Sequence, residues 1–531
     1  MASTPTTKSQ VQAYQFVLRR MESALVRKDA VMLHDPMGSH KRATIAGAVL
    51  AAIGCIGFLV WGLFGGKGSV PQPGSIIIGK ETGAVFVVTS DQQADKRLIP
   101  MLNVASAKLL VMQQGGAQGS GAVPTTVVKE SALGDFPRGS LTGLVNAPTY
   151  LPDSKNIAVP SWAVCDVGQV KDSINDARVE EETKVQTTVI GGDDNHGAEL
   201  APDQSLYVKD QTSKREYLIY RVQDLPGQPH THAVKSLVNS TETTVMDMYG
   251  LRGATPRTIS TNMLNAIPEV PALHVPNIPR DGEALQGYMT NRKVGDVVSR
   301  TVPGQNDEFY LLLPSGKQKI SEGAAAVLHA AKTNSKDIPN ATGAITDADE
   351  ADSSEQVNLS GYPMAVPKPV TFQQSDTSCL SWKNVNGDQN ITVTLNKGTP
   401  AAKAAVKLAQ YDGTGPMVDY FYMPAGKAAV VRGASNEAGA DSGPIFMVSD
   451  QGVQYGVKDV PTAQGLGVIG GAGDVKAGPS WLTRVLPKGD FLDPANASMT
   501  YDAVPVGPGV NRPPENPNNP QQQAGSAQAG S

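Results

Sequence analysis

An uncharged apolar segment near the N-terminus is the feature that most constrains how this chain can fold. Residues 43–66 contain no Asp, Glu, Lys or Arg. At a rise of about 1.5 Å per residue, a helix of this length crosses a hydrocarbon layer of roughly 30 Å. A soluble helix that is apolar on every side would need apolar cover all round. The segment therefore predicts a transmembrane helix.

Basic residues are concentrated before this segment. The first 42 residues contain seven Lys or Arg and three Asp or Glu, whereas Lys67 and Lys80 are the next basic residues after the segment. Because positive flanks stay in the cytoplasm, the N-terminus is expected there, and residues 67–503 are expected on the periplasmic side of the inner membrane. A cleaved signal peptide is the alternative, but its charged and apolar regions would both be too long, and no Ala-x-Ala site follows.

The net charge of −5 divides into +4 for residues 1–42 and −9 for the rest. An acidic exported region argues against nucleic-acid binding. Residues 504–531 hold six prolines and two charged residues, a composition that predicts a disordered tail. The expected organisation is thus a cytoplasmic segment (1–42), a span (43–66), an exported region (67–503) and a tail (504–531).

Residues 9–33 are predicted to form an amphipathic helix. Ser9 and Gln12 fit a capping box, and Asp35-Pro36 supplies a stop. Apolar residues at spacings of three and four form one stripe: Val11, Tyr14, Leu18, Met21 and Leu25. Such a stripe needs a partner, which can be a membrane surface, a second copy or another protein.

Small residues recur at four-residue intervals within the span, at Ala43, Gly47, Ala51 and Cys55. A face of this kind lets helices approach closely in lipid. The alternative is that the spacing reflects only the Ala/Gly-rich composition of the segment.

Short β-like runs dominate the exported region, and several belong to a recurring unit. Phe86-Val-Val-Thr-Ser-Asp-Gln resembles Phe446-Met-Val-Ser-Asp-Gln, and the runs at 217–222 and 309–313 look like the same strand in two further copies. Apolar helical segments are expected after them, at 104–110, 233–238, 324–328 and 460–468. We therefore predict four diverged copies of a unit of strands plus a helix, around a central core formed by residues 125–200 and 360–425.

Two of the three cysteines lie in the exported region, where thiols oxidise. Cys165 and Cys379 each stand three residues from a tryptophan that could shield a bridge in a core. One disulfide is predicted, with two free buried thiols as the alternative. Cys55 lies inside the span and is interpreted as a packing residue.

Nucleotide-binding motifs are matched only in part. Gly74-Ser-Ile-Ile-Ile-Gly-Lys80 nearly matches a P-loop, but Glu81 stands where Ser or Thr is required and the β-branched residues favour a strand. Gly465-Leu-Gly-Val-Ile-Gly470 matches the dinucleotide pattern in letters, without an evident preceding strand. We expect no cofactor and no catalytic residue.

Metal-binding patterns are equally incomplete. His230-Thr-His232 lacks a third ligand, so a surface loop is favoured. Asp347-Ala-Asp-Glu-Ala-Asp352 fails the EF-hand pattern at its fifth and sixth positions, and is interpreted as a solvated acidic loop. We expect no metal site.

The segment Ser9-Gln-Val, then Tyr14, then Leu18-Arg-Arg-Met-Glu and Ala24-Leu-Val-Arg, followed by Met32-Leu-His-Asp-Pro, resembles the EccB family. These proteins are the B-type membrane components of mycobacterial type VII (ESX) secretion systems. The resemblance extends over the whole chain, including the single span, the Trp/Cys pairs, the diverged repeats and the Pro-rich end.

The resemblance implies an α+β protein with an elongated exported region, in which a central core is flanked by four repeat domains. It also implies a large inner-membrane complex with the EccC motor ATPase, EccD, EccE and the mycosin protease MycP. Self-association is expected as well. Some members carry an ATPase label, so an exported ATP hydrolase or cell-wall hydrolase is the alternative function. ATP is implied by that label alone.

Overall fold

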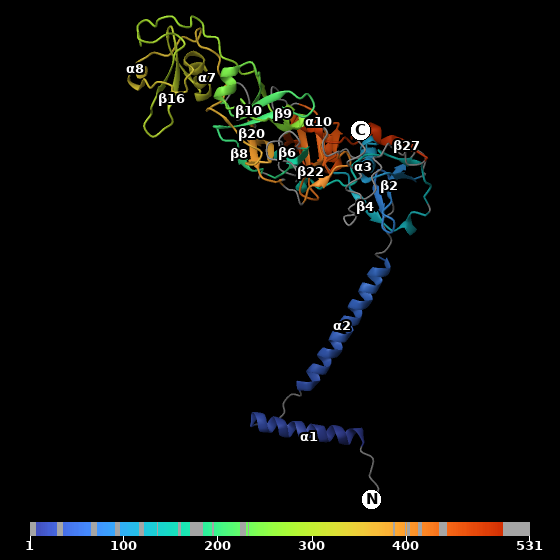
Figure 1. Ribbon diagram of the computed structural model, residues 1–531. Helices are drawn as coiled ribbons and strands as arrows, with labels where there is room; N and C mark the ends of the chain where they lie inside the picture. The colour runs from blue at the N-terminus through green and yellow to red at the C-terminus, as the bar shows by residue number, and fades with distance from the viewer. Residues whose placement is uncertain are drawn as a thin grey trace, which may run out of the picture. The chain divides into compact units, whose positions relative to one another are not determined.

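The computed structural model describes most of the chain. The described residues are 7–28, 36–64, 72–90, 96–115, 122–134, 136–157, 161–169, 184–193, 196–223, 230–231, 233–385, 388–398, 400, 404–411, 417–434 and 443–502. The chain divides into an N-terminal unit with the two long helices and a larger unit with all of the sheets (Figure 1). The predicted tail and His232 lie outside the described residues.

The N-terminal unit contains α1 (Lys8–Arg27) and α2 (Pro36–Phe64). The cap of α1 differs from the predicted one, because Gln10 accepts a hydrogen bond from the Thr7 N–H at 3.0 Å. The helix also ends earlier than predicted, at Arg27. Lys28 is its C-terminal cap: it adopts a left-handed conformation and donates its N–H to the carbonyl of Ala24. Pro36 begins α2, since proline suits the first turn, where its missing N–H is not needed.

Five sheets make up the larger unit, and four of them repeat one topology. In each repeat, three strands form an antiparallel meander, a helix follows, and a fourth segment returns parallel to the first strand. A second short helix then leads to a fifth segment that lies parallel to the third strand. This common order confirms that the chain contains four diverged copies of one unit.

Repeats 1 and 2 use strands throughout. Repeat 1 consists of β1 (Ile76–Gly79), β2 (Val85–Ser90), β3 (Lys96–Met101), α3 (Val104–Gln113), β4 (Thr125–Val128), η1 (Glu130–Ala132) and β5 (Leu141–Thr142). Repeat 2 consists of β9 (Gln204–Asp210), β10 (Glu216–Tyr220), β12 (Val234–Leu237), α5 (Thr243–Met248), β13 (Arg257–Ile259), α6 (Thr261–Ala266) and β14 (Glu269–Val270).

Repeats 3 and 4 replace some of the outer strands by single bridges. Repeat 3 consists of β15 (Val297–Arg300), β16 (Glu308–Leu313), β17 (Gly316–Ile320), α7 (Glu322–Thr333), a bridge at Asn340, α8 (Thr342–Thr346) and a bridge at Glu350. Repeat 4 consists of β23 (Ala428–Ala434), β24 (Ile445–Ser449), β25 (Gln454–Val457), α9 (Val460–Leu466), β26 (Lys476–Pro479), α10 (Leu482–Val485) and bridges at Lys488 and Leu492.

Side-chain caps fix where the main helix of three repeats begins. Asn103, Ser321 and Asp459 stand at the N-cap positions of α3, α7 and α9, and each accepts a hydrogen bond from an N–H of the first turn. Such caps satisfy backbone donors that have no partner within the helix. The predicted helix at 233–238 is wrong, because this segment is β12. Most of its residues are buried because β12 lies between two other strands of its sheet, and α5 begins only at Thr243.

The same position of the third strand carries a buried polar side chain in three repeats. Lys235 and Lys317 each donate a hydrogen bond to a carbonyl of the second short helix, at 2.8 and 2.9 Å. Gln454 does the same in repeat 4, at 2.8 Å to Thr483 and 3.1 Å to Leu486. In repeat 1 the position is Leu98. The residues bridged to these four on the fifth segment are Glu269, Glu350, Lys488 and Arg138.

The central sheet has the order β11-β20-β19-β6-β7-β22-β21, with β8 (Ala198–Glu199) beside β20. The strands that make up this order are β6 (Ser161–Gln169), β7 (Lys184–Gly191), β11 (His230–Thr231), β19 (Thr377–Val385), β20 (Asp388–Asn396), β21 (Val406–Lys407) and β22 (Tyr420–Tyr422). The predicted core therefore starts too early, since the strands at 125–142 belong to repeat 1. The remaining strands, β18 (Lys368–Pro369) and β27 (Thr500–Tyr501), join the sheets of repeats 2 and 1.

The larger hydrophobic clusters among the described residues are each shared between parts of the larger unit. One is shared by repeats 1 and 4, a second by repeats 2 and 3, and a third by the central sheet with elements of repeats 2 and 4. The first is reinforced by a hydrogen bond from Lys108 Nζ to the Leu466 carbonyl, 358 residues away in the chain. Repeats 2 and 3, which are neighbours in the chain, thus share one core, whereas repeat 1 completes its core with repeat 4, which is distant in sequence.

Candidate functional site

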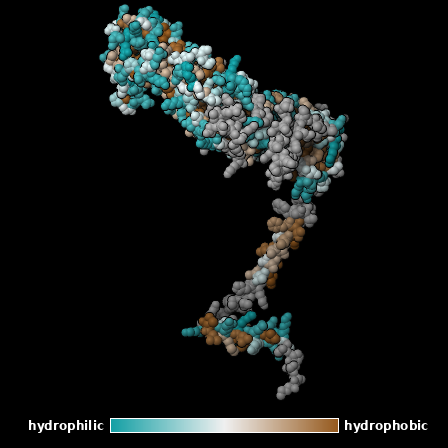
Figure 2. Space-filling model, viewed as in Figure 1, coloured by the Kyte–Doolittle hydropathy of each residue, from teal (hydrophilic) through white to brown (hydrophobic). Residues whose placement is uncertain are grey.

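The apolar surface of α2 lacks cover from the described residues. The window Arg42–Leu59 has a mean hydropathy of 1.8, and none of its residues is buried. Phe58, for example, is 84% exposed. Figure 2 shows apolar and neutral residues following one another along this helix. By length and composition α2 can cross a membrane.

The predicted small-residue face lies on the same helix. Ala43, Gly47, Ala51 and Cys55 are all exposed, and a Cβ added at Gly47 would have nothing within 4 Å. A second helix could therefore approach this face without steric hindrance from the described residues. Its use in helix packing stays a prediction.

The apolar stripe of α1 is also exposed. Exposure ranges from 45% at Val11 to 83% at Leu25 across the five predicted residues, which include Tyr14, Leu18 and Met21. Apolar and hydrophilic residues both appear along α1 in Figure 2. The stripe is thus available to a partner, as its pattern indicates.

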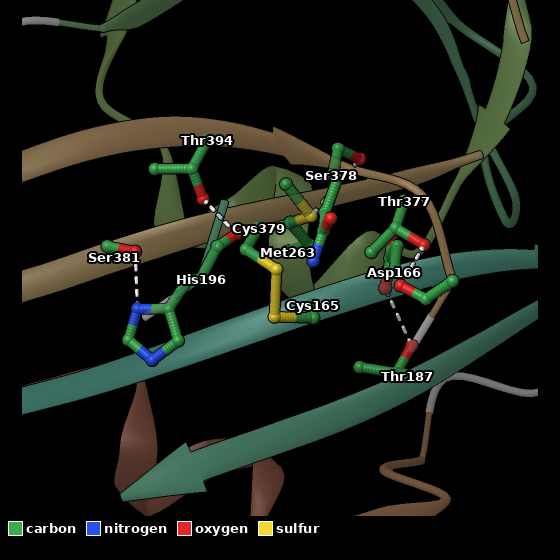
Figure 3. Close-up of a disulfide and its surroundings, with 12 residues drawn as sticks. Cys165, Asp166, Thr187, His196, Met263, Thr377, Ser378, Cys379, Ser381 and Thr394 are labelled. Atoms are coloured by element: carbon green, nitrogen blue, oxygen red, sulfur yellow. Dashed lines mark hydrogen bonds between the residues drawn. A yellow bond between two sulfur atoms is a disulfide. The ribbon is translucent and has the colours of Figure 1, made fainter. Parts of the chain in front are cut away.

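Cys165 and Cys379 form a disulfide in the central sheet (Figure 3). They lie directly opposite each other on β6 and β19, and both are fully buried. Ala163, Ile190 and Tyr422 pack around them. The pairing is the one that the sequence predicts, and Cys55 is the free cysteine among the described residues.

The tryptophans do not shield the bridge in the way expected. Trp162 and Trp382 are also directly opposite each other, but they belong to the large core that includes Val164 and Leu380. Residues three apart on a strand point to opposite faces of the sheet, so the disulfide lies on the other face. His196 lies on the bridge's side, where its Nδ1 is 2.9 Å from the hydroxyl of Ser381 (Figure 3).

A buried carboxylate beside the bridge ties the central sheet to repeat 2. Asp166 accepts hydrogen bonds from the Ser260 N–H at 2.6 Å, the Ser260 hydroxyl at 2.8 Å and the Thr187 hydroxyl at 2.9 Å. Burial, assisted by the nearby carboxylate of Asp419, raises the pKa of Asp166 to about 6, although these hydrogen bonds oppose the rise. Sequence reasoning missed this residue, because its partners come from other strands.

The P-loop-like segment is a strand, as predicted, and its backbone amides are already used. Residues 76–79 form β1, which pairs with β2 on one side and with β4 on the other. The Glu130 carboxylate accepts hydrogen bonds from the N–H groups of Glu81 and Thr82 at 3.0 and 2.8 Å. A phosphate at this turn would meet two carboxylates and no free amide cradle. Lys80 is exposed on the same turn.

The second glycine-rich match has a different structure from the one expected. A strand, β25, does precede it, which corrects the prediction that none does. The glycines nevertheless stand at the C-terminal end of α9, where Gly467 forms the left-handed cap at φ 80°. A dinucleotide site needs them at the helix N-terminus, so this segment lacks that geometry. The acidic side chains at 347–352 are exposed, as predicted.

Among the described residues, no group of three or more His, Cys, Asp or Glu is placed to hold a metal ion. The side chain of His230 is not described. The chain thus combines an N-terminal unit of two exposed helices, one of them long and apolar enough to cross a membrane, with a larger unit built from sheets.

Comparison with known proteins identifies the family. Residues 3–506 match the family model described as "Type VII secretion system ESX-1, transport TM domain B". The chain belongs to this family, whose members are membrane components of type VII secretion. The match confirms the family that the N-terminal segment of this chain resembles.

Relatives match over nearly their whole length. The ESX-3 secretion system ATPase EccB3 of Mycolicibacterium smegmatis is 28% identical, with 94% of this chain and 92% of the relative covered. The ESX-1 secretion system ATPase EccB1 of Mycobacterium tuberculosis is 27% identical, with 96% and 98% covered.

Solved structures share the fold. A chain of an intact ESX-5 inner membrane complex aligns with a TM-score of 0.61 at 23% identity, covering 96% of this chain and 98% of that chain. A chain of an EccB3 dimer from the ESX-3 core complex aligns with a TM-score of 0.60 at 22% identity, covering 80% and 100%. The α+β architecture built from repeats is therefore that of these proteins.

Proposed function

We propose that this chain is a single-pass, non-catalytic subunit of a type VII (ESX) secretion complex in the inner membrane. The proposal depends on one exposed helix of membrane-spanning length among the described residues of a chain that matches the family model over residues 3–506. Its folded region associates with further copies of the chain on the periplasmic side. Support for this association comes from similar chains in an ESX-5 periplasmic assembly and in an EccB3 dimer.

The orientation follows from charge. Lys41 and Arg42 immediately precede the apolar window, and Arg19 and Arg20 lie further upstream, so the N-terminal side is the one retained in the cytoplasm. The acidic folded region is then exported. In the proposed orientation, α1 meets cytoplasmic neighbours and Cys165–Cys379 lies in an oxidising compartment.

Exposed α1 supplies a surface for those neighbours. We assign its stripe to packing against other subunits of the complex, with EccC, EccD, EccE and MycP as the partner set that the family implies. Each Å² of apolar surface that a partner covers on these five side chains favours the association by about 25 cal/mol, against the entropic cost of binding.

The alternative is an exported hydrolase, since the relatives above carry ATPase in their names. The geometry around Lys80 speaks against ATP at that position, because carboxylates occupy the turn and the amides are paired. Purified full-length chain assayed for ATP hydrolysis, with and without Mg²⁺, separates the two functions. Turnover that survives further purification would favour the enzyme.

Replacing Tyr14, Leu18 and Met21 by Asp tests the assembly role of α1. The triple variant should insert in the membrane but no longer copurify with the other subunits, because three charges then stand on the packing face. Co-purification is measured by affinity capture of the tagged chain followed by mass spectrometry.

A matched control places three Asp residues on the other side of the helix, at Gln12, Phe16 and Ser23. This variant should copurify like the wild type, since helix propensity and net charge change in the same way in both. Equal retention of both variants in the complex would contradict the proposed role of the stripe.

A further inference from the structure

A cavity of about 630 Å³ lies between repeats 2 and 3. Its walls come from the end of α5, from β15, β16 and α7, and from residues 366–368, which lead back to the central sheet. The two repeats share one hydrophobic core, so the shape of the cavity is fixed by packing. Cavities of this size are typical of small-ligand sites.

Acidic side chains are in excess along the lining. Asp307, Glu322 and Asp337 line the cavity, and none of them forms an ion pair with the described residues. A fourth carboxylate, Asp247, is bound to Arg252. Lys368 and Lys336 are the cations of the lining, and Lys336 lies near the already paired Asp247.

The position of Glu322 alone would not indicate a site, because a glutamate in the first turn of a helix is favoured by the helix dipole. Asp307 and Asp337 have no such explanation, since neither lies in a helix. Burial, the largest cause, and the carboxylates of Asp203 and Asp307 raise the pKa of Glu322, against a hydrogen bond from the Val366 backbone. The lining therefore holds four carboxylates against two lysines, and its negative charge is only partly compensated.

Ser299 adds a polar group inside the cavity wall. Its side chain is only 6% exposed, and its hydroxyl has no hydrogen-bond partner among the described residues. Most buried hydroxyl groups in proteins are hydrogen-bonded. A group that enters the cavity can provide the missing partner.

Apolar side chains line the remaining wall, including Met248, Phe309 and Ile338. A bare metal ion would leave this wall unused, and the described residues hold no metal-binding group of three ligands. An anion would be repelled by the unpaired carboxylates. The lining instead combines an apolar surface with carboxylates, which suits an aliphatic chain that ends in a positive charge.

We propose that this cavity, walled by Asp307, Glu322, Asp337 and Ser299, is a binding site for an alkylammonium or alkylguanidinium group. The carboxylates hold the charged end, the Ser299 hydroxyl accepts one of its hydrogens, and the apolar wall covers the aliphatic part. A lysine or arginine side chain of a polypeptide and a free polyamine share this chemistry.

Calorimetric titration of the full-length chain in detergent tests the proposal with four probes. Nα-acetyl-lysine amide and Nα-acetyl-arginine amide represent a polypeptide side chain, spermidine represents a free polyamine, and Nα-acetyl-norleucine amide lacks only the positive charge. We expect one of the charged probes to bind at least ten times more tightly than the norleucine amide. Tighter binding of an amide than of spermidine would identify a polypeptide as the source, and the reverse would identify a polyamine.

Two conservative variants assign the binding to the cavity. Asp307→Asn and Glu322→Gln should each weaken binding of the charged probe at least fivefold, whereas Asp349→Asn, at an exposed carboxylate outside the lining, should leave it unchanged. Melting curves of each variant confirm that it is folded. For the wild type, binding should also weaken as salt rises from 50 to 500 mM, a measurement that needs no variant.

Three results would overturn the proposal: no binding of any charged probe, equal binding of the norleucine amide, or wild-type affinity in both cavity variants. Because the readout is probe binding to the isolated chain, none of these results bears on membership of a secretion complex.

Discussion

Loss of the Cys165–Cys379 disulfide should strongly destabilise the folded region. The bridge joins residues 214 positions apart. In the chain-entropy model, closing a loop of this length stabilises the folded state by about 5 kcal/mol, because it restricts the unfolded chain. Typical domains are stable by only about 5–15 kcal/mol, so this contribution is large.

The appropriate perturbation is replacement of both cysteines by alanine. Serine would add a buried hydroxyl without a partner, at a further cost of about 1–3 kcal/mol. For a cooperative unit of 150–250 residues, each kcal/mol shifts the melting temperature by roughly 2–4 °C, so a decrease of roughly 10–20 °C is expected. Thermal unfolding of the detergent-solubilised chain, followed by tryptophan fluorescence, measures it.

Cys55→Ala is the matched control and should leave the melting temperature unchanged, because Cys55 is exposed on α2 and free. Peptide mass spectrometry without reduction reports the bridge itself. If the bridge is intact in the wild-type protein and the double-alanine variant still melts within about 2 °C of it, the entropic reasoning is refuted. Free thiols at both positions in protein isolated from the cell envelope would refute the pairing.

Four further predictions follow from the structure. Reporter fusions at Ser39 and Ser140 should report opposite sides of the membrane, and matching signals would contradict the orientation. Lys80→Ala should leave secretion and any ATP turnover unchanged, and a hydrolytic activity lost in this variant would falsify the non-catalytic function. The pKa of Asp166 is about 6 in the folded state and 3.8 in the unfolded state, so between these pH values only the folded state binds the proton. The free energy of unfolding should therefore fall by up to about 3 kcal/mol as pH rises from 4 to 6. Urea titrations should show a weaker dependence of this free energy on pH in Asp166→Asn. Lys317→Gln introduces the residue found at this position in repeat 4 and should destabilise the fold less than Lys317→Met. The methionine leaves the helix carbonyl without a hydrogen-bond donor, which costs about 1–3 kcal/mol. Equal losses of stability in the two variants would count against the equivalence of the repeats.

Local pattern predicted much of the fold. The span, the stripe of α1, the strand at β1 and the four repeated units all depend on residues that are close in sequence. The segment at 233–238 was predicted to be a helix because a strand buried on both faces shows no alternation of polar and apolar residues. Its sequence pattern therefore does not distinguish it from a buried helix. The expected shielding of the bridge by the tryptophans is also wrong, because a spacing of three within a strand puts the tryptophan and the cysteine on opposite faces of the sheet.

The candidate sites depend on longer-range pairing, so the sequence indicated them less well. Asp166 acquires its role only when Ser260 of repeat 2 meets the central sheet. Residues of the proposed cation cavity span 247–368 and converge only because repeats 2 and 3 share a core. One signal was present in the sequence: Lys235 interrupts an apolar strand, and a lysine there must find a buried partner.

The core shared by repeats 1 and 4 has a consequence for biogenesis. Repeat 1 is synthesised before the other repeats, yet its hydrophobic face is covered by residues 428–497, which are synthesised after repeats 2 and 3. Until then, this apolar surface stays open to other proteins. A chain truncated before repeat 4 would keep that surface exposed, and exposed apolar surface favours aggregation. Only a chain synthesised through repeat 4 can close the core of repeat 1.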